Sequence, residues 1–152
     1  MDFSKAARLQ ERLAGRIRLS WGSGKVRRVA GADVACSRGD DRMAAAVVVL
    51  SYPGLKILET ASVRQRLRIP YVPGFLSFRE GPPPLRALRR QRIGPDVTLL
   101  DGNGIAHPRR LGLASHVGVL LDIPTVGCAK SPFYPFQPPD KKREPGRTTG
   151  TG

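Results

Sequence analysis

VRRVAGADVACSRGDDRMAAAVVVL, residues 26–50, contains two apolar runs separated by a polar turn segment. The runs at 26–36 and 43–50 are rich in β-branched and small residues, which is typical of strands. A Pro-Gly pair at 53–54 then leads to a third, more loosely alternating run at 56–65. Three strands joined by such short turns predict an antiparallel meander.

Helical and strand patterns continue on both sides of this meander. Apolar residues at three- and four-residue steps predict an amphipathic helix over 4–19. The later pattern predicts a short helix ending at Glu80, a helix from the prolines at 82–84 to Ile93, a strand at 97–100, a helix near 111–121 and a strand at 125–129. We therefore expect one α/β domain over 1–131, with three antiparallel strands followed by parallel strands and flanking helices. The composition of 132–152, which is mostly proline, glycine, threonine and charged residues, predicts a disordered tail.

Charge is the second feature that narrows the function. The chain has 152 residues and a formal net charge of +14, from 26 lysines and arginines against 12 acidic residues. Arginine forks match phosphate geometry, so a nucleic acid is the first partner to consider. A compositional bias that only keeps the protein soluble would explain the charge equally well. No signal peptide is visible, and the longest apolar run, 43–50, is too short to span a bilayer, so we expect a cytoplasmic protein without a membrane partner.

Two cysteines, Cys36 and Cys128, each lie in a short apolar run. This setting predicts small buried residues and neither a disulfide nor a metal pair.

Three acidic residues have positions that suggest a metal site. Asp33 lies in the middle of a predicted strand, where a buried carboxylate needs a partner, and Asp101 ends another strand. Glu80 ends a short predicted helix. Each alone is explained by an ordinary cap or a solvated side chain. Together, two aspartates on neighbouring strands favour a hard cation such as Mg²⁺, which removes their repulsion and can activate water.

Four motifs then resemble the endonuclease V family. They are GADV at 31–34, PYVPGFLSFRE at 70–80, DGNGIAHPRRLGLASH at 101–116 and IPTVGCAKS at 123–131. The resemblance implies a ribonuclease H-like fold and a metal-dependent endonuclease of DNA repair. Such an enzyme recognises deoxyinosine or other deaminated bases in DNA and hydrolyses the second phosphodiester bond 3′ to the lesion. It further implies inosine in RNA as another substrate and a monomeric protein.

The resemblance also implies roles for individual residues. The ligands of Mg²⁺, or alternatively Mn²⁺, are Asp33, Glu80 and Asp101, and with Lys130 near the scissile phosphate these form the catalytic set. The wedge that enters DNA at the lesion is Pro70, Tyr71, Val72 and Pro73. The pocket for the flipped base is lined by Gly74, Leu76, Gly102, Ile105 and His107. Phosphate contacts fall to Arg109 and Arg110, whereas His116 is interpreted as structural. Taken without the motifs, each of these residues has an ordinary structural reading, such as a core tyrosine, a loop glycine or a surface lysine.

The end of the chain departs from the family pattern. Family members continue with further strands and a last helix that brings a histidine near the metal, so we expect the C-terminal part of the fold to be missing. The alternative function is therefore a truncated, catalytically weak nucleic-acid-binding module. A general ribonuclease H-like nuclease without inosine preference is a third reading, which the wedge and the loop at 101–107 disfavour.

Overall fold

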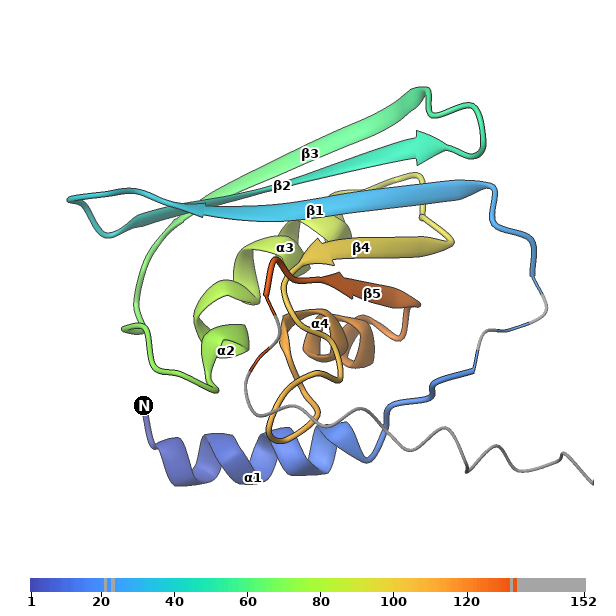
Figure 1. Cartoon of the computed structure of the whole chain (residues 1–152). Helices are drawn as coiled ribbons and strands as arrows, with labels where there is room; N and C mark the ends of the chain where they lie inside the picture. Colours follow the sequence, from blue (N-terminus) through green and yellow to red (C-terminus); the bar gives the residue numbers. More distant parts are fainter. Residues whose placement is uncertain (21, 23, 132, 134–152) are drawn as a thin grey trace, which may run out of the picture.

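A five-stranded mixed sheet forms the centre of the computed structural model, which describes residues 1–20, 22, 24–131 and 133 (Figure 1). Its strands are β1 (Arg28–Cys36), β2 (Arg42–Ser51), β3 (Ile57–Arg66), β4 (Val97–Asp101) and β5 (Thr125–Cys128), in the spatial order β3-β2-β1-β4-β5. The first three strands pair antiparallel, whereas β4 pairs parallel to β1 and β5 parallel to β4. The predicted meander followed by parallel strands is therefore confirmed.

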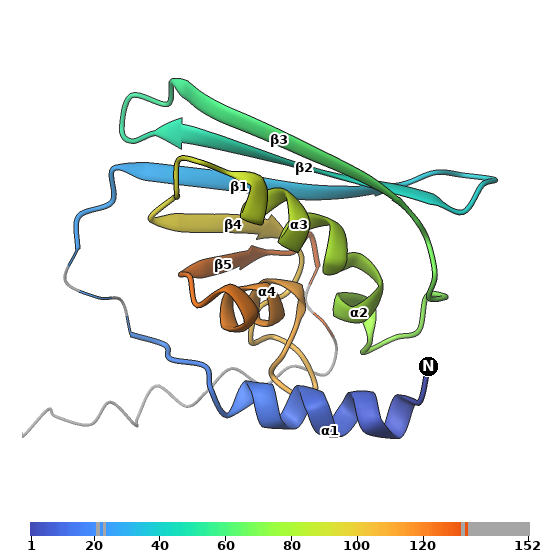
Figure 2. The same cartoon turned by 180° about the vertical axis from the view of Figure 1, so that it is seen from behind.

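Four helices accompany the sheet in the described part of the chain. They are α1 (Phe3–Ala14), α2 (Leu76–Glu80), α3 (Pro82–Arg90) and α4 (Leu113–Leu121). Figure 2 shows α3 and α4 against the same face of the sheet, with α1 on the outer side of α4. The helix predicted over 4–19 is shorter than expected, because Gly15 caps it after Ala14. Its start is fixed by Asp2, whose carboxylate accepts hydrogen bonds from the backbone of Ser4 and Lys5.

The core lies between the sheet and α3 and α4. Side chains that alternate along β1 and β2 point into it, and Val47 and Val49 are fully buried. Its buried members are Ala30, Ala32, Val47, Val49, Val63, Ala87, Leu88, Leu100, Leu113, Ala114 and Val117.

Within the described residues, the opposite face of the sheet is open to solvent. Strand pairing sets Val48, Gly31, Leu99 and Val126 in one row across four strands, and Leu99 and Val126 are 40% and 46% exposed. A Cβ added at Gly31 would meet nothing within 4 Å. A shallow hollow of about 550 Å³ lies over this row.

The structure corrects one expectation from sequence. Cys36 and Cys128 are free, as predicted, but both are exposed and not buried. An apolar run predicts burial on both faces of a strand, whereas Cys36 ends β1 and Cys128 ends the outermost strand, β5. The tail predicted from residue 132 lies, apart from Phe133, outside the described residues. Among the described helices, none combines the length and apolar character needed to cross a membrane.

Candidate metal and nucleic-acid site

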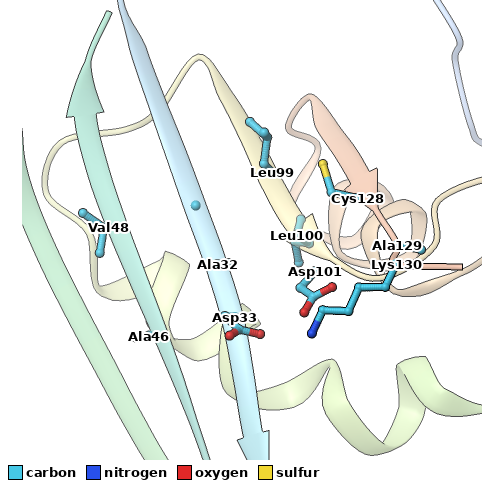
Figure 3. A pocket seen from close by; sticks show the side chains of 11 residues that line it. Ala32, Asp33, Ala46, Val48, Leu99, Leu100, Asp101, Cys128, Ala129 and Lys130 are labelled. Carbon is cyan, nitrogen blue, oxygen red and sulfur yellow. The ribbon is translucent and has the colours of Figure 1, made fainter. Parts of the chain in front are cut away.

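Two aspartates lie side by side on the open face. The parallel register pairs Ala32 of β1 with Leu100 of β4, so the next residues, Asp33 and Asp101, are neighbours on adjacent strands. Figure 3 shows their carboxylates close together at one end of the hollow, with the ammonium group of Lys130 pointing toward them. This arrangement follows from the two-residue period of a strand, which turns Asp33 away from the core that Ala32 enters.

The repulsion between these two carboxylates depends on how far they are exposed to solvent. Both aspartates are exposed, so the buried carboxylate expected for Asp33 is not observed. One Asp33 oxygen accepts a hydrogen bond from the backbone N–H of Val34 at 2.8 Å. Two carboxylates at about 4 Å would still repel by roughly 4 kcal/mol at an effective dielectric near 20. A cation between them removes this repulsion, and the ammonium group of Lys130 points toward the pair.

Glu80 joins this acidic group from α2. Burial raises the pKa of Glu80, Arg79 opposes the rise, and Asp101 and Asp33 raise the pKa further. The Sγ of Cys36 lies 3.9 Å from its Oε1. Within the described residues, however, no group of three His, Cys, Asp or Glu side chains is placed to hold one metal ion. An ion shared by all three carboxylates thus stays a prediction, although the charges of Asp33 and Asp101 both raise the pKa of Glu80.

The aspartate pair nevertheless fits a hard divalent cation. Both carboxylates are exposed and aligned in one row, and oxygen is the ligand atom that Mg²⁺ prefers. Because Mg²⁺ keeps several of its waters, two protein carboxylates are enough to hold it.

The loop at 70–75 presents an aromatic side chain to solvent. Tyr71 is 61% exposed, and the guanidinium of Arg79 lies 5.9 Å from its ring centroid. A turn between Val72 and Phe75 closes the loop through a 3.0 Å backbone hydrogen bond. Gly74 is the third residue of this turn and has φ +81°, a conformation that favours glycine. The loop is thus tightly turned, with its tyrosine free to contact a ligand.

The loop that follows β4 is held by its own backbone and by β5. Gly112 N–H donates to Gly104 O at 2.8 Å, and Ala114 N–H donates to Asn103 O at 3.0 Å. A Cβ on Gly127 would come within 2.6 Å of Gly102 O and 2.8 Å of Asn103 C. The sequence analysis missed Gly127, whose only signal was a glycine inside a strand.

The predicted base-pocket residues do not all line one cavity. Gly74 and His107 are joined by a 3.0 Å hydrogen bond from His107 Nε2 to Gly74 O. Ile105 lines a different hollow, of about 940 Å³, together with Lys130. Gly102 packs against the side chain of Leu113, and Leu76 lies in α2. A single pocket for a base thus stays a prediction.

The two predicted phosphate contacts differ in their surroundings. Arg110 is exposed with φ 57°. The guanidinium of Arg109 instead donates to Gly74 O at 2.7 Å and lies 4.5 Å from the ring centroid of Phe75. Arg109 is thus occupied by contacts within the protein.

His116 is structural in this geometry, as the sequence analysis proposed. It lies in α4, is 7% exposed and shares a 2.9 Å hydrogen bond through Nδ1 with the hydroxyl of Ser77. The ring of Phe78 packs edge-on at 5.2 Å. Burial, and to a smaller extent His107, lowers the pKa of His116 to about 4.

This lowered pKa predicts a loss of stability in acid. The unfolded chain binds a proton at His116 near pH 6.5, whereas the folded chain does so only near pH 4. Folding therefore becomes less favourable as the pH falls through this window, by about 2 kcal/mol between pH 7 and 5. In urea unfolding, His116→Gln should remove that part of the pH dependence, and an unchanged difference between pH 7 and 5 would contradict the assignment.

Comparison with known proteins places this site in a family context. The family model of endonuclease V matches residues 11–151. The endonuclease V of Roseiflexus sp. (strain RS-1) is 50% identical over 130 residues, which cover 86% of this chain and 58% of the relative. The crystal structure of endonuclease V from Streptomyces avermitilis superposes with a TM-score of 0.77 at 43% identity, covering 84% of this chain and 57% of that one.

A third match includes a nucleic acid. Endonuclease V (D234N) from Ciona intestinalis, solved in complex with a 23mer DNA containing an inosine followed by a ribo-adenosine, is 38% identical with a TM-score of 0.77. It covers 88% of this chain and 60% of the Ciona chain. The expected ribonuclease H-like fold is thereby confirmed. The chain spans about three-fifths of the length of the relatives that it matches.

Proposed function

Since the chain belongs to the endonuclease V family, we propose that it is a metal-dependent endonuclease that recognises deoxyinosine in DNA. We propose further that it hydrolyses the second phosphodiester bond 3′ to the lesion, as a step of DNA repair in the cytoplasm. The observation that carries this proposal is the exposed pair Asp33 and Asp101 with Lys130 directed at it. Other deaminated bases, inosine in RNA and a monomeric state belong to the same proposal.

In this proposal the carboxylates hold the metal ion, and Lys130 stabilises charge at the reacting phosphate. Asp33 and Asp101 would hold Mg²⁺, or Mn²⁺, and the charge of Glu80 interacts with both carboxylates. The ion, when bound, supplies a polarised phosphate and an activated water. Lys130 points at the same place, where its ammonium group stabilises negative charge that develops on the phosphate.

In this proposal the loop at 70–75 and the loop after β4 recognise the lesion. Tyr71 is exposed just before a tightly turned segment, and an aromatic ring can replace the stacking that is lost when a base is flipped. Arg110, which is exposed, is the arginine available for a phosphate on the path of the strand.

One observation favours the alternative function, a module that binds the lesion but cleaves weakly. Among the described residues no three acidic, histidine or cysteine side chains are placed to share an ion. With a site of two carboxylates, binding through the loops would survive better than catalysis.

Tyr71→Ala provides the test of the proposal. The wild-type chain should nick a labelled duplex with a single deoxyinosine in Mg²⁺, and should bind this duplex in preference to the matched undamaged one. Tyr71→Ala should reduce that preference by about tenfold, because stacking contributes roughly 1–3 kcal/mol per base.

The matched control is Tyr52→Ala, since Tyr52 is 53% exposed on the turn between β2 and β3. This variant should keep the preference. Selective binding without nicking would support the alternative function. Equal binding of both duplexes by the wild type would remove the proposal.

A further inference from the structure

The carbonyl of Gly74 is the meeting point of three segments. Nε2 of Gln10, in α1, donates to it at 3.0 Å, and a guanidinium nitrogen of Arg109 donates at 2.7 Å. His107 Nε2 lies at 3.0 Å from the same oxygen. His107 Nδ1 accepts from the backbone N–H of Arg109 at 3.1 Å, so its proton is on Nε2 and the third contact is also a donation.

The side chains that make these contacts are fixed in turn. Gln10 is fully buried, and its carbonyl oxygen accepts a hydrogen bond from Nε of Arg109, so both ends of its amide are used. The guanidinium plane of Arg109 lies over Phe75, whose ring packs edge-on against Phe3 at 5.1 Å. A buried polar side chain with all its partners supplied specifies one arrangement, because any other leaves a buried group unpaired.

We infer that Gln10 and Arg109 are positioning residues that fix the recognition loop at 70–75 through the Gly74 carbonyl. The inference rests on the proposed function. It gives Arg109 a role other than the predicted phosphate contact, because the guanidinium is already engaged by Gly74, Gln10 and Phe75.

Gln10 and Arg109 form a clamp on the Gly74 carbonyl, and the position of Gly74 explains why this clamp matters for recognition. Gly74 lies three residues after Tyr71 and two before Leu76, and its left-handed conformation sets the direction of the chain between them. A loop that is ordered before DNA arrives loses little conformational freedom on binding, so the clamp favours the complex with the correct base.

The first test uses the free chain and needs no nucleic acid. Hydrogen exchange of peptides covering 70–76 should accelerate by about tenfold in Gln10→Glu, which replaces the donor to Gly74 by an acceptor, and in Arg109→Lys, which loses the planar fork that bonds Gly74 and Gln10 together. Peptides from β2 should exchange as in the wild type. Gln10→Glu keeps the size and the acceptor that Arg109 uses, which protects the fold. Arg110→Ala, at the exposed neighbouring arginine, is the control and should leave the loop unchanged.

The second test measures binding to duplexes with and without deoxyinosine over a range of salt. Arg109→Lys should reduce the preference for deoxyinosine by about tenfold, since lysine keeps the charge but not the planar fork. The slope of log affinity against log salt should not change. Arg110→Ala should flatten that slope by about 0.9 for one lost phosphate contact and keep the preference.

These outcomes separate the inference from the proposed function. Unchanged exchange of 70–76 in both Gln10→Glu and Arg109→Lys overturns the inference. Full preference in Arg109→Lys together with a flatter salt slope in Arg109→Ala also overturns it. A wild-type chain without preference for deoxyinosine would remove the proposed function, while the exchange experiment would still decide whether the clamp holds the loop.

Discussion

Asp101→Asn should reduce Mg²⁺-dependent cleavage of a deoxyinosine duplex by about 10³-fold, because a bound cation contributes several kcal/mol of charge stabilisation. The fold should be kept, since the side chain is exposed, asparagine has the same shape, and the repulsion with Asp33 is removed. Single-turnover assays measure the loss of cleavage rate, and a Mg²⁺ titration followed by calorimetry measures the loss of Mg²⁺ affinity.

The control for this prediction is Asp122→Asn. Asp122 is an exposed carboxylate with φ 52°, a conformation that asparagine accepts, and it pairs with Arg18 away from the aspartate pair. Its replacement should leave the cleavage rate and the Mg²⁺ affinity unchanged. Equal rates for Asp101→Asn and the wild type would show that the ion is held elsewhere.

Gly127→Ala should lower the free energy of unfolding by about 2 kcal/mol, as overpacking of a tight contact does. The added methyl group would meet the backbone of Gly102 and Asn103, which cannot rotate away. The loop after β4 must shift to admit it, and a displacement of about 1 Å at a reacting centre can cost roughly 100-fold in rate. Urea unfolding and single-turnover cleavage should therefore both respond.

Gly31→Ala is the matched substitution for stability, in the same sheet and with open space around the new methyl group. It should leave the free energy of unfolding unchanged or slightly higher, because alanine restricts the unfolded chain more than glycine does. If both variants unfold at the same urea concentration, the backbone contact at Gly127 is not tight in solution.

Local pattern was enough to predict the sheet. The runs around Asp33 and Val47 have the composition of strands, and the short turns between them allow only an antiparallel pairing. The same logic placed Asp101 at a strand end next to Asp33. The strands themselves depend on residues close in sequence, whereas the meeting of Asp33 and Asp101 follows from the usual parallel pairing of strands joined through a helix.

Contacts between segments that are far apart in sequence could not be predicted in the same way. Cys36 is exposed at the end of β1, and the alternation of residues along a strand does not show which of its ends the helices leave uncovered. Gln10 meets Gly74 across 64 positions of sequence, and a glutamine in an amphipathic helix has the same pattern whether it is solvated or buried. Gly127 is a further case, because it lies in β5 while its close neighbours belong to the loop after β4.

The parallel register of β1 and β4 has a consequence for how such a chain can diverge. Asp33 and Asp101 share a face only while the number of residues from the start of each strand to its aspartate stays fixed, because the side-chain period is two. Insertion of one residue between Arg28 and Asp33 would turn that carboxylate toward the helices. The turn between Cys36 and Arg42 comes after the aspartate and is free of this constraint. Among descendants of this gene, length changes should therefore accumulate in that turn and be absent from the four positions before Asp33, where only substitutions are tolerated.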